Sequence, residues 1–89
     1  MQKKDIVIIN KLGLHARAAA KFVTLASQFE SAVEVARNGQ KVNGKSIMGV
    51  MMLAASKGTT LTVSVDGPDE AEAMQQIEAL ILDRFQEAE

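Results

Sequence analysis

The residues from Thr60 to Asp66 alternate strictly between polar and apolar side chains. Leu61, Val63 and Val65 would lie on one side of an extended chain, and the polar residues between them would lie on the other. A strand with this pattern is buried on one face and open to water on the other. The segment therefore predicts a sheet that is covered by a second layer on only one side.

The rest of the chain divides into short segments with the periodicity of a strand or a helix. Asn38-Gly39 predicts a tight hairpin because both residues tolerate a positive φ. Ser46 is a suitable N-cap for a second helix that Lys57-Gly58 would close, and Pro68 suits the first turn of a last helix. We expect strands at Asp5–Ile9, Ser31–Arg37, Gln40–Asn43 and Thr60–Asp66, a first helix at Ala16–Phe29, and a last helix that buries Met74, Ile77, Ile81 and Phe85. Four strands with helices on one face make a two-layer α+β domain.

The composition favours one small domain over residues 1–89. The chain has no cysteine, which excludes a disulfide framework and favours a cytoplasmic setting. The apolar run Ile6–Ile9 is too short for a signal peptide or a membrane span. The net charge of −1 and the absence of tryptophan and tyrosine disfavour a nucleic-acid-binding module.

His15 is the only histidine of the chain, and it precedes the first expected helix. The first backbone N–H groups of a helix have no partner within the helix, and together with Arg17 they form an anion site. A neutral imidazole at such a site can attack phosphorus and then carry the phosphoryl group. The alternative interpretation is that His15 only caps or packs against the helix. No second histidine, cysteine or nearby acid suggests a metal site.

Two motifs resemble those of a known family. Residues 10–18, NKLGLHARA, resemble the active-site segment of the histidine-containing phosphocarrier proteins (HPr) of the bacterial phosphotransferase system. Residues 44–53, GKSIMGVMML, resemble the regulatory serine segment of the same family. The resemblance extends over essentially the whole chain. It implies an open-faced β-sandwich, with a four-stranded antiparallel sheet and three helices on one face.

The resemblance also implies a function. The protein would be a phosphoryl carrier rather than an enzyme, with no cofactor or metal of its own, and we expect it to be a cytoplasmic monomer. Enzyme I would pass a phosphoryl group derived from phosphoenolpyruvate to Nδ1 of His15, and the carrier would hand it to a histidine of an enzyme IIA protein. Arg17 would hold the phosphoryl group, together with the helix start at Ala16, Arg17 and Ala18.

One residue departs from the family pattern, and one question stays open. Many members have proline where this chain has Ala18, and proline would pre-set φ and remove a backbone N–H from the first turn. Alanine leaves that N–H free to face a phosphate. The motifs do not separate the sugar branch of the family from its nitrogen-related regulatory branch.

The second motif assigns Ser46 either a capping role alone or a second role as the target of an HPr kinase/phosphorylase. A phosphate on Ser46 would add a charge of about −2 beside an apolar patch of Ile47, Met48, Met51 and Met52. Helical spacing places Ile47, Val50 and Met51 in the core, and the more exposed methionines would dock partners. A regulatory binding protein that is switched through Ser46 is therefore the alternative function.

Overall fold

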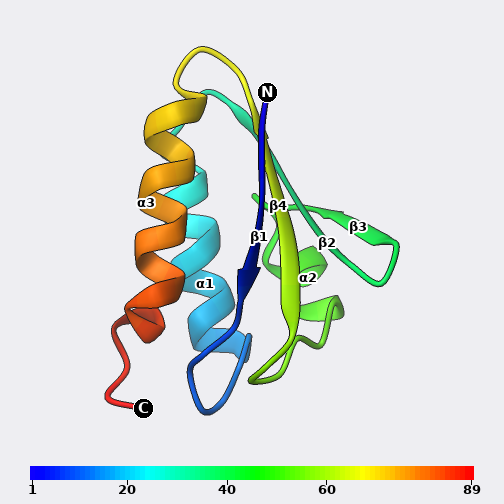
Figure 1. Cartoon of the computed structure of the whole chain (residues 1–89), viewed down its shortest axis with the longest axis vertical. Coiled ribbons are helices and arrows are strands. Elements are labelled where there is room, and N and C mark those ends of the chain that lie inside the picture. The colour runs from blue at the N-terminus through cyan, green and yellow to red at the C-terminus, as the bar shows by residue number, and fades with distance from the viewer.

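The sheet contains four antiparallel strands in the order β1-β4-β2-β3. The computed structural model describes residues 1–89. Its elements are β1 (Gln2–Val7), α1 (Ala16–Ala26), β2 (Ala32–Arg37), β3 (Gln40–Asn43), α2 (Ile47–Met52), β4 (Thr60–Asp66), α3 (Glu70–Leu82) and a 3₁₀ turn, η1 (Arg84–Gln86). Helices α1 and α3 pack side by side against the sheet, and α2 packs on α1 and β3 (Figure 1). The predicted fold class is confirmed.

Strand β4 lies in the interior of the sheet and pairs with both β1 and β2. Leu61, Val63 and Val65 are completely buried, and the polar residues between them face the open side of the sheet. The predicted alternation and the bounds of this strand are confirmed. Buried apolar side chains from the sheet and the helices form one core cluster between the two layers.

The β2–β3 hairpin turns at Asn38 and Gly39, as predicted. Their φ angles are +51° and +82°, and Arg37 pairs with Gln40 across the turn. Positive φ at both central residues matches the right-handed twist of the two strands. The bounds predicted for β3 are also confirmed, and β2 begins one residue later than expected.

Strand β1 covers Gln2–Val7, so the predicted range Asp5–Ile9 is wrong at both ends. This strand is at the edge of the sheet and pairs only with β4, from Gln2 opposite Val65 to Val7 opposite Thr60. It therefore ends where its partner begins. The apolar run at 6–9 indicated a fully buried strand, but the side chain of Val7 is exposed on the open face.

The helices are shorter than predicted. Helix α1 ends at Ala26, three residues before Phe29. Helix α2 ends at Met52 because Ala54 has a φ of +50°, and Arg37 Nη1 donates hydrogen bonds to the carbonyl oxygens of Leu53 and Ala54. The Lys57-Gly58 signal does not close this helix. The Gly58 N–H instead donates to the Ile8 carbonyl oxygen, which joins this loop to the end of β1.

Helix α3 begins at Glu70 and ends at Leu82. Pro68 therefore lies before the helix rather than in its first turn, because Asp69 is the N-cap residue. The predicted stripe of Met74, Ile77, Ile81 and Phe85 is buried, but Phe85 lies beyond the helix, in η1. No helix combines the length and the apolar character that a membrane span needs.

Candidate functional site

His15 is the N-cap residue of α1. Its backbone is extended, with φ −71° and ψ 177°, and its carbonyl oxygen accepts the first bond of the helix from the Ala19 N–H at 2.9 Å. The ring nitrogen Nδ1 accepts a hydrogen bond from the Arg17 backbone N–H at 3.3 Å. The imidazole thus takes the place that a serine or aspartate side chain usually has at a helix start, and its Nδ1 points toward the unpaired N–H groups of the helix.

The loop at residues 10–14 brings His15 to this position. Gly13 has a φ of +67°, and a Cβ there would lie 2.4 Å from the Ala55 carbonyl oxygen. The Leu14 N–H donates to the same oxygen at 2.8 Å, so the loop lies directly on the chain at Ala55. The buried side chain of Asn10 crosses the loop and donates from Nδ2 to the Gly13 carbonyl oxygen at 2.9 Å.

Glu87 completes the surroundings of the ring. One oxygen of its carboxylate, Oε2, is hydrogen-bonded to His15 Nε2, and the other, Oε1, accepts from Asn10 Nδ2 at 2.9 Å. Burial alone would raise the pKa of Glu87, but the hydrogen bonds from Asn10 and His15 outweigh it and lower this pKa. An ionised carboxylate only accepts hydrogen bonds, so Nε2 is the donor in this pair, and the Arg17 N–H can donate only to an Nδ1 that carries no proton.

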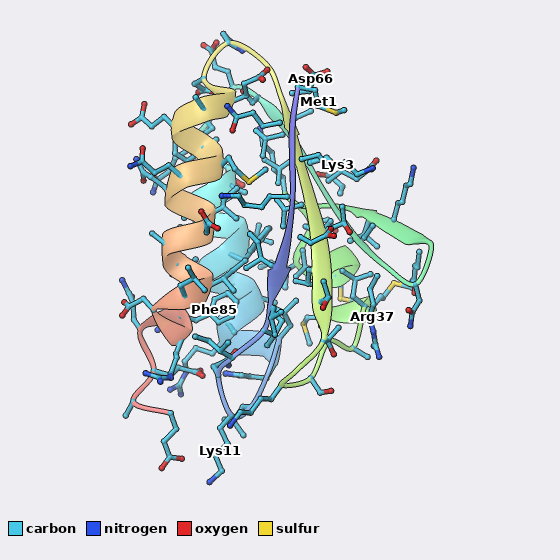
Figure 2. The ribbon with its side chains drawn as sticks, viewed as in Figure 1. Met1, Lys3, Lys11, Arg37, Asp66 and Phe85 are labelled. Atoms are coloured by element: carbon cyan, nitrogen blue, oxygen red, sulfur yellow. The ribbon has the colours of Figure 1, made fainter.

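A strained turn just before Glu87 places its side chain next to the His15 ring. Arg84, Phe85 and Gln86 have φ angles of +54°, +53° and +65°. This left-handed backbone costs about 1–2 kcal/mol per residue when the side chain has a Cβ. The complete burial of Phe85 and a 2.7 Å hydrogen bond from Lys21 Nζ to its carbonyl oxygen hold the turn in place. Phe85 and Lys11 lie at the same end of the molecule (Figure 2).

Arg17 provides an unpaired cation at the start of α1, two residues after His15. Its side chain is exposed, and its guanidinium forms no hydrogen bond or ion pair with the rest of the protein. It lines an open depression of about 620 Å³ together with Lys11, Lys21 and Glu87. Arg17 and Glu87 are the two residues that hydrogen bond to the His15 ring.

The helix start predicted at Ala16, Arg17 and Ala18 is the first turn of α1. The Arg17 N–H is bonded to His15 Nδ1, whereas the N–H groups of Ala16 and Ala18 have no acceptor within the protein. Ala16 is exposed, so its backbone N–H is open to an anion at the helix start, whereas Ala18 is completely buried, so its N–H does not face the surface as expected. No group of three or more histidine, cysteine, aspartate or glutamate side chains lies where it could hold a metal ion.

Ser46 is the N-cap residue of α2, as predicted. Its Oγ accepts a hydrogen bond from the Gly49 N–H at 3.1 Å. The residue is half-buried and lies directly before the exposed apolar side chains of α2. A group attached to Oγ would replace this cap at the start of the helix.

The apolar residues of α2 divide differently from the predicted core spacing. Val50 is completely buried, but Ile47 and Met51 are 44% and 38% exposed, so their assignment to the core is wrong. The helix has only six residues, and its contact with the core is made through Val50 and its C-cap residue Leu53. We define the docking patch as the four exposed side chains of α2: Ile47, Met48, Met51 and Met52.

Three residues of the site were not predicted as site residues. Asn10 bonds to Glu87 and to the Gly13 carbonyl oxygen of the loop, and Glu87 bonds to the His15 ring. Leu12, in the loop before His15, is 66% exposed and lines the depression beside Arg17. Leu12 has a sequence signal, since it is an isolated large apolar residue in a turn. Glu87 has none, because it is 72 residues away from His15.

Comparison with known proteins identifies the family. Residues 2–83 match the family model described as the PTS HPr component phosphorylation site. The chain is 60% identical to the phosphocarrier protein HPr of Cupriavidus necator over 89 residues, which cover all of both chains. It is 54% identical to the phosphocarrier protein HPr of Pseudomonas aeruginosa, again over the whole length of both.

Solved structures agree with this assignment. The crystal structure of HPr from Thermoanaerobacter tengcongensis superposes with a TM-score of 0.96, at 46% identity and with full coverage of both chains. HPr from Bacillus anthracis gives a TM-score of 0.87 at 38% identity, covering 90% of this chain and 95% of that one. Both the sequence and the arrangement of the sheet and helices are shared, so the chain belongs to the HPr family of phosphocarrier proteins of the phosphotransferase system.

Proposed function

We propose that the protein accepts a phosphoryl group on Nδ1 of His15 from phosphorylated Enzyme I and passes it to a histidine of an enzyme IIA protein. The observation that carries this proposal is the state of the ring. Nε2 is bonded to Glu87, while Nδ1 accepts a hydrogen bond from the Arg17 N–H and faces the start of α1. The nitrogen that is not held by the carboxylate is therefore the one beside the anion site.

The transfer needs only one bond to form and one to break. The Nδ1 lone pair attacks the phosphorus of a phosphohistidine on Enzyme I, and the P–N bond of the donor breaks and returns its electron pair to the donor ring. The guanidinium of Arg17 and the exposed backbone N–H of Ala16 then neutralise the oxygens of the bound phosphoryl group.

The docking patch supports the rest of the proposal. Met48 and Met52 are 71% and 65% exposed, and flexible methionines suit a surface that meets several partners in turn. We propose that Enzyme I and enzyme IIA bind here, that the carrier is a cytoplasmic monomer, and that it needs no cofactor. Phosphorylation of Ser46 by an HPr kinase/phosphorylase would place about −2 charge beside this patch.

Phosphorylation with purified components tests the carrier function. The protein is incubated with phosphoenolpyruvate and Enzyme I, and mass spectrometry is expected to show the gain of one phosphoryl group that is acid-labile and base-stable. His15→Ala is expected to gain nothing, while Ser46→Ala, the matched control, gains the group as the wild type does. Labelling of His15→Ala would exclude His15 as the acceptor.

The branch of the family is decided by the same assay. Enzyme I from a sugar relay and Enzyme I from a nitrogen-related relay are compared as donors, and the faster transfer identifies the branch.

A regulatory binding protein switched through Ser46 is the second candidate function, because the Ser46 hydroxyl caps the helix that carries the docking patch. It predicts binding of a partner without any phosphoryl transfer to His15.

A further inference from the structure

The carboxylate of Glu87 is held in a defined position rather than loosely at the surface. Its side chain is only 16% exposed, and its Oε1 is bonded to the buried side chain of Asn10. The turn at residues 84–86 and the Lys21–Phe85 hydrogen bond fix the chain just before it. These contacts therefore fix the position of Glu87 Oε2 next to His15 Nε2.

We infer that Glu87 is a positioning residue for phosphoryl transfer, which keeps the ring proton of His15 on Nε2 so that Nδ1 is the nucleophile in every cycle. This inference rests on the proposed carrier function. A neutral imidazole in water exchanges its proton between the two nitrogens, and a carboxylate partner fixes one tautomer and one ring orientation. The Arg17 N–H contributes from the other side, because it can donate only to an unprotonated Nδ1.

The proton then stays in place through both transfers. When Nδ1 attacks phosphorus, the ring becomes a phosphorylated imidazolium that still carries its proton on Nε2, and the Glu87 carboxylate stabilises this positive charge. When the phosphoryl group leaves for the acceptor histidine, the P–N bond pair returns to Nδ1 and the ring is neutral again. Neither direction needs a proton from water, which suits a carrier that must both receive and release the group.

The position of Glu87 also limits repulsion between its carboxylate and the bound phosphoryl group. Nε2 is on the opposite edge of the ring from Nδ1, so the carboxylate faces the proton rather than the phosphoryl oxygens. Those oxygens meet the start of α1 and Arg17 instead. A carboxylate at the Nδ1 side would have blocked the phosphoryl group, whereas at Nε2 it acts only through the ring.

Nitrogen NMR of the ring tests the first half of the inference on the unphosphorylated protein. The ¹⁵N chemical shifts of the two ring nitrogens report which one carries the proton. We expect the wild type to have the proton on Nε2, Glu87→Ala to show a mixture of tautomers, and Glu87→Gln, whose amide oxygen still accepts, to resemble the wild type. Glu89→Gln is the matched control, because Glu89 pairs only with Lys11 and is 72% exposed.

Transfer rates from phosphorylated Enzyme I test the second half. We expect Glu87→Ala to be slower by about 10-fold or more, Glu87→Gln to be intermediate, and Glu89→Gln to match the wild type. Unchanged tautomers or an unchanged transfer rate in Glu87→Ala would overturn the inference while leaving the carrier function intact. A wild-type protein that takes no phosphoryl group from either Enzyme I would overturn both.

Discussion

Asp69, the residue before α3, accepts hydrogen bonds from both the backbone N–H and the hydroxyl of Ser31, at the beginning of β2. Its second carboxylate oxygen accepts from the Glu30 N–H at 2.9 Å. Asp69 therefore ties the start of one element to the start of another, and it does not cap its own helix through a side-chain bond. The Ser31 hydroxyl is the main cause of a lowered pKa of Asp69, followed by the Glu30 N–H.

This lowered pKa predicts a loss of stability in acid. The folded pKa lies below the ordinary value of 3.8, so the contribution of Asp69 is complete above that value and is lost as the pH falls through the folded pKa. Asp69→Asn is expected to lower the free energy of unfolding at neutral pH, and its difference from the wild type is expected to shrink below about pH 4. Urea denaturation over this pH range measures the difference. Asp83→Asn is the control, and a pH-independent difference for Asp69→Asn would contradict the prediction.

Gly13→Ala is expected to destabilise the protein more than Gly39→Ala. Both residues have a left-handed backbone, which costs about 1–2 kcal/mol for alanine. Only at position 13 does the new Cβ also meet backbone, 2.4 Å from the Ala55 carbonyl oxygen, whereas nothing lies within 4 Å at position 39. We expect a further cost of about 1–3 kcal/mol for Gly13→Ala, measured by urea denaturation. Equal losses in the two variants would show that the loop can move away from Ala55.

Arg17→Ala is expected to slow phosphoryl transfer without unfolding the protein. The side chain is exposed and has no partner in the resting structure, so stability should change by less than about 0.5 kcal/mol. Loss of a cation that stabilises the transferring group should reduce the rate by about 100-fold. Stopped-flow or quench-flow transfer from Enzyme I and a thermal melt measure the two effects. Lys57→Ala removes an exposed cation elsewhere and serves as the control; a rate equal to that of the wild type would remove Arg17 from the mechanism.

Substitutions of Ser46 separate its capping role from its proposed regulatory role. Ser46→Ala removes the acceptor for the Gly49 N–H and is expected to cost about 1 kcal/mol of stability. Ser46→Asp can still cap α2 and should remain as stable as the wild type, but its charge beside the docking patch should weaken the binding of Enzyme I. Denaturation and titration calorimetry measure the two effects. Gln75→Glu adds the same charge on α3 and should bind normally. Normal binding by Ser46→Asp would refute the proposed effect of a charge at position 46 on the binding of Enzyme I.

The sequence predicts best where the signal is local. The alternation at Thr60–Asp66 and the Asn38-Gly39 turn depend on neighbouring residues, and the structure has both as expected. The ends of β1 and α2 were wrong because each is set by a distant partner, β4 in one case and Arg37 in the other. Periodicity alone cannot show where such a partner will stop an element.

The site also has one part that depends on neighbouring residues and one part that depends on distant ones. His15 and Arg17 are separated by one residue, so a helix start brings them together whatever the rest of the chain does. The contact between Glu87 and His15 needs three left-handed residues in a row, none of them glycine. No local rule predicts that turn, because its backbone strain is offset by the burial of Phe85, and the core that buries Phe85 exists only in the folded chain.

The pairing of β4 with both β1 and β2 has a consequence for synthesis on the ribosome. Until residues 60–66 have been made, β1 and the β2–β3 hairpin have no strand between them, and the sheet cannot close. A nascent chain must therefore keep its apolar surfaces exposed for most of its elongation. Because the pairs that close the sheet are far apart in sequence, their loop-closure entropy should also make refolding slow for a chain of this length.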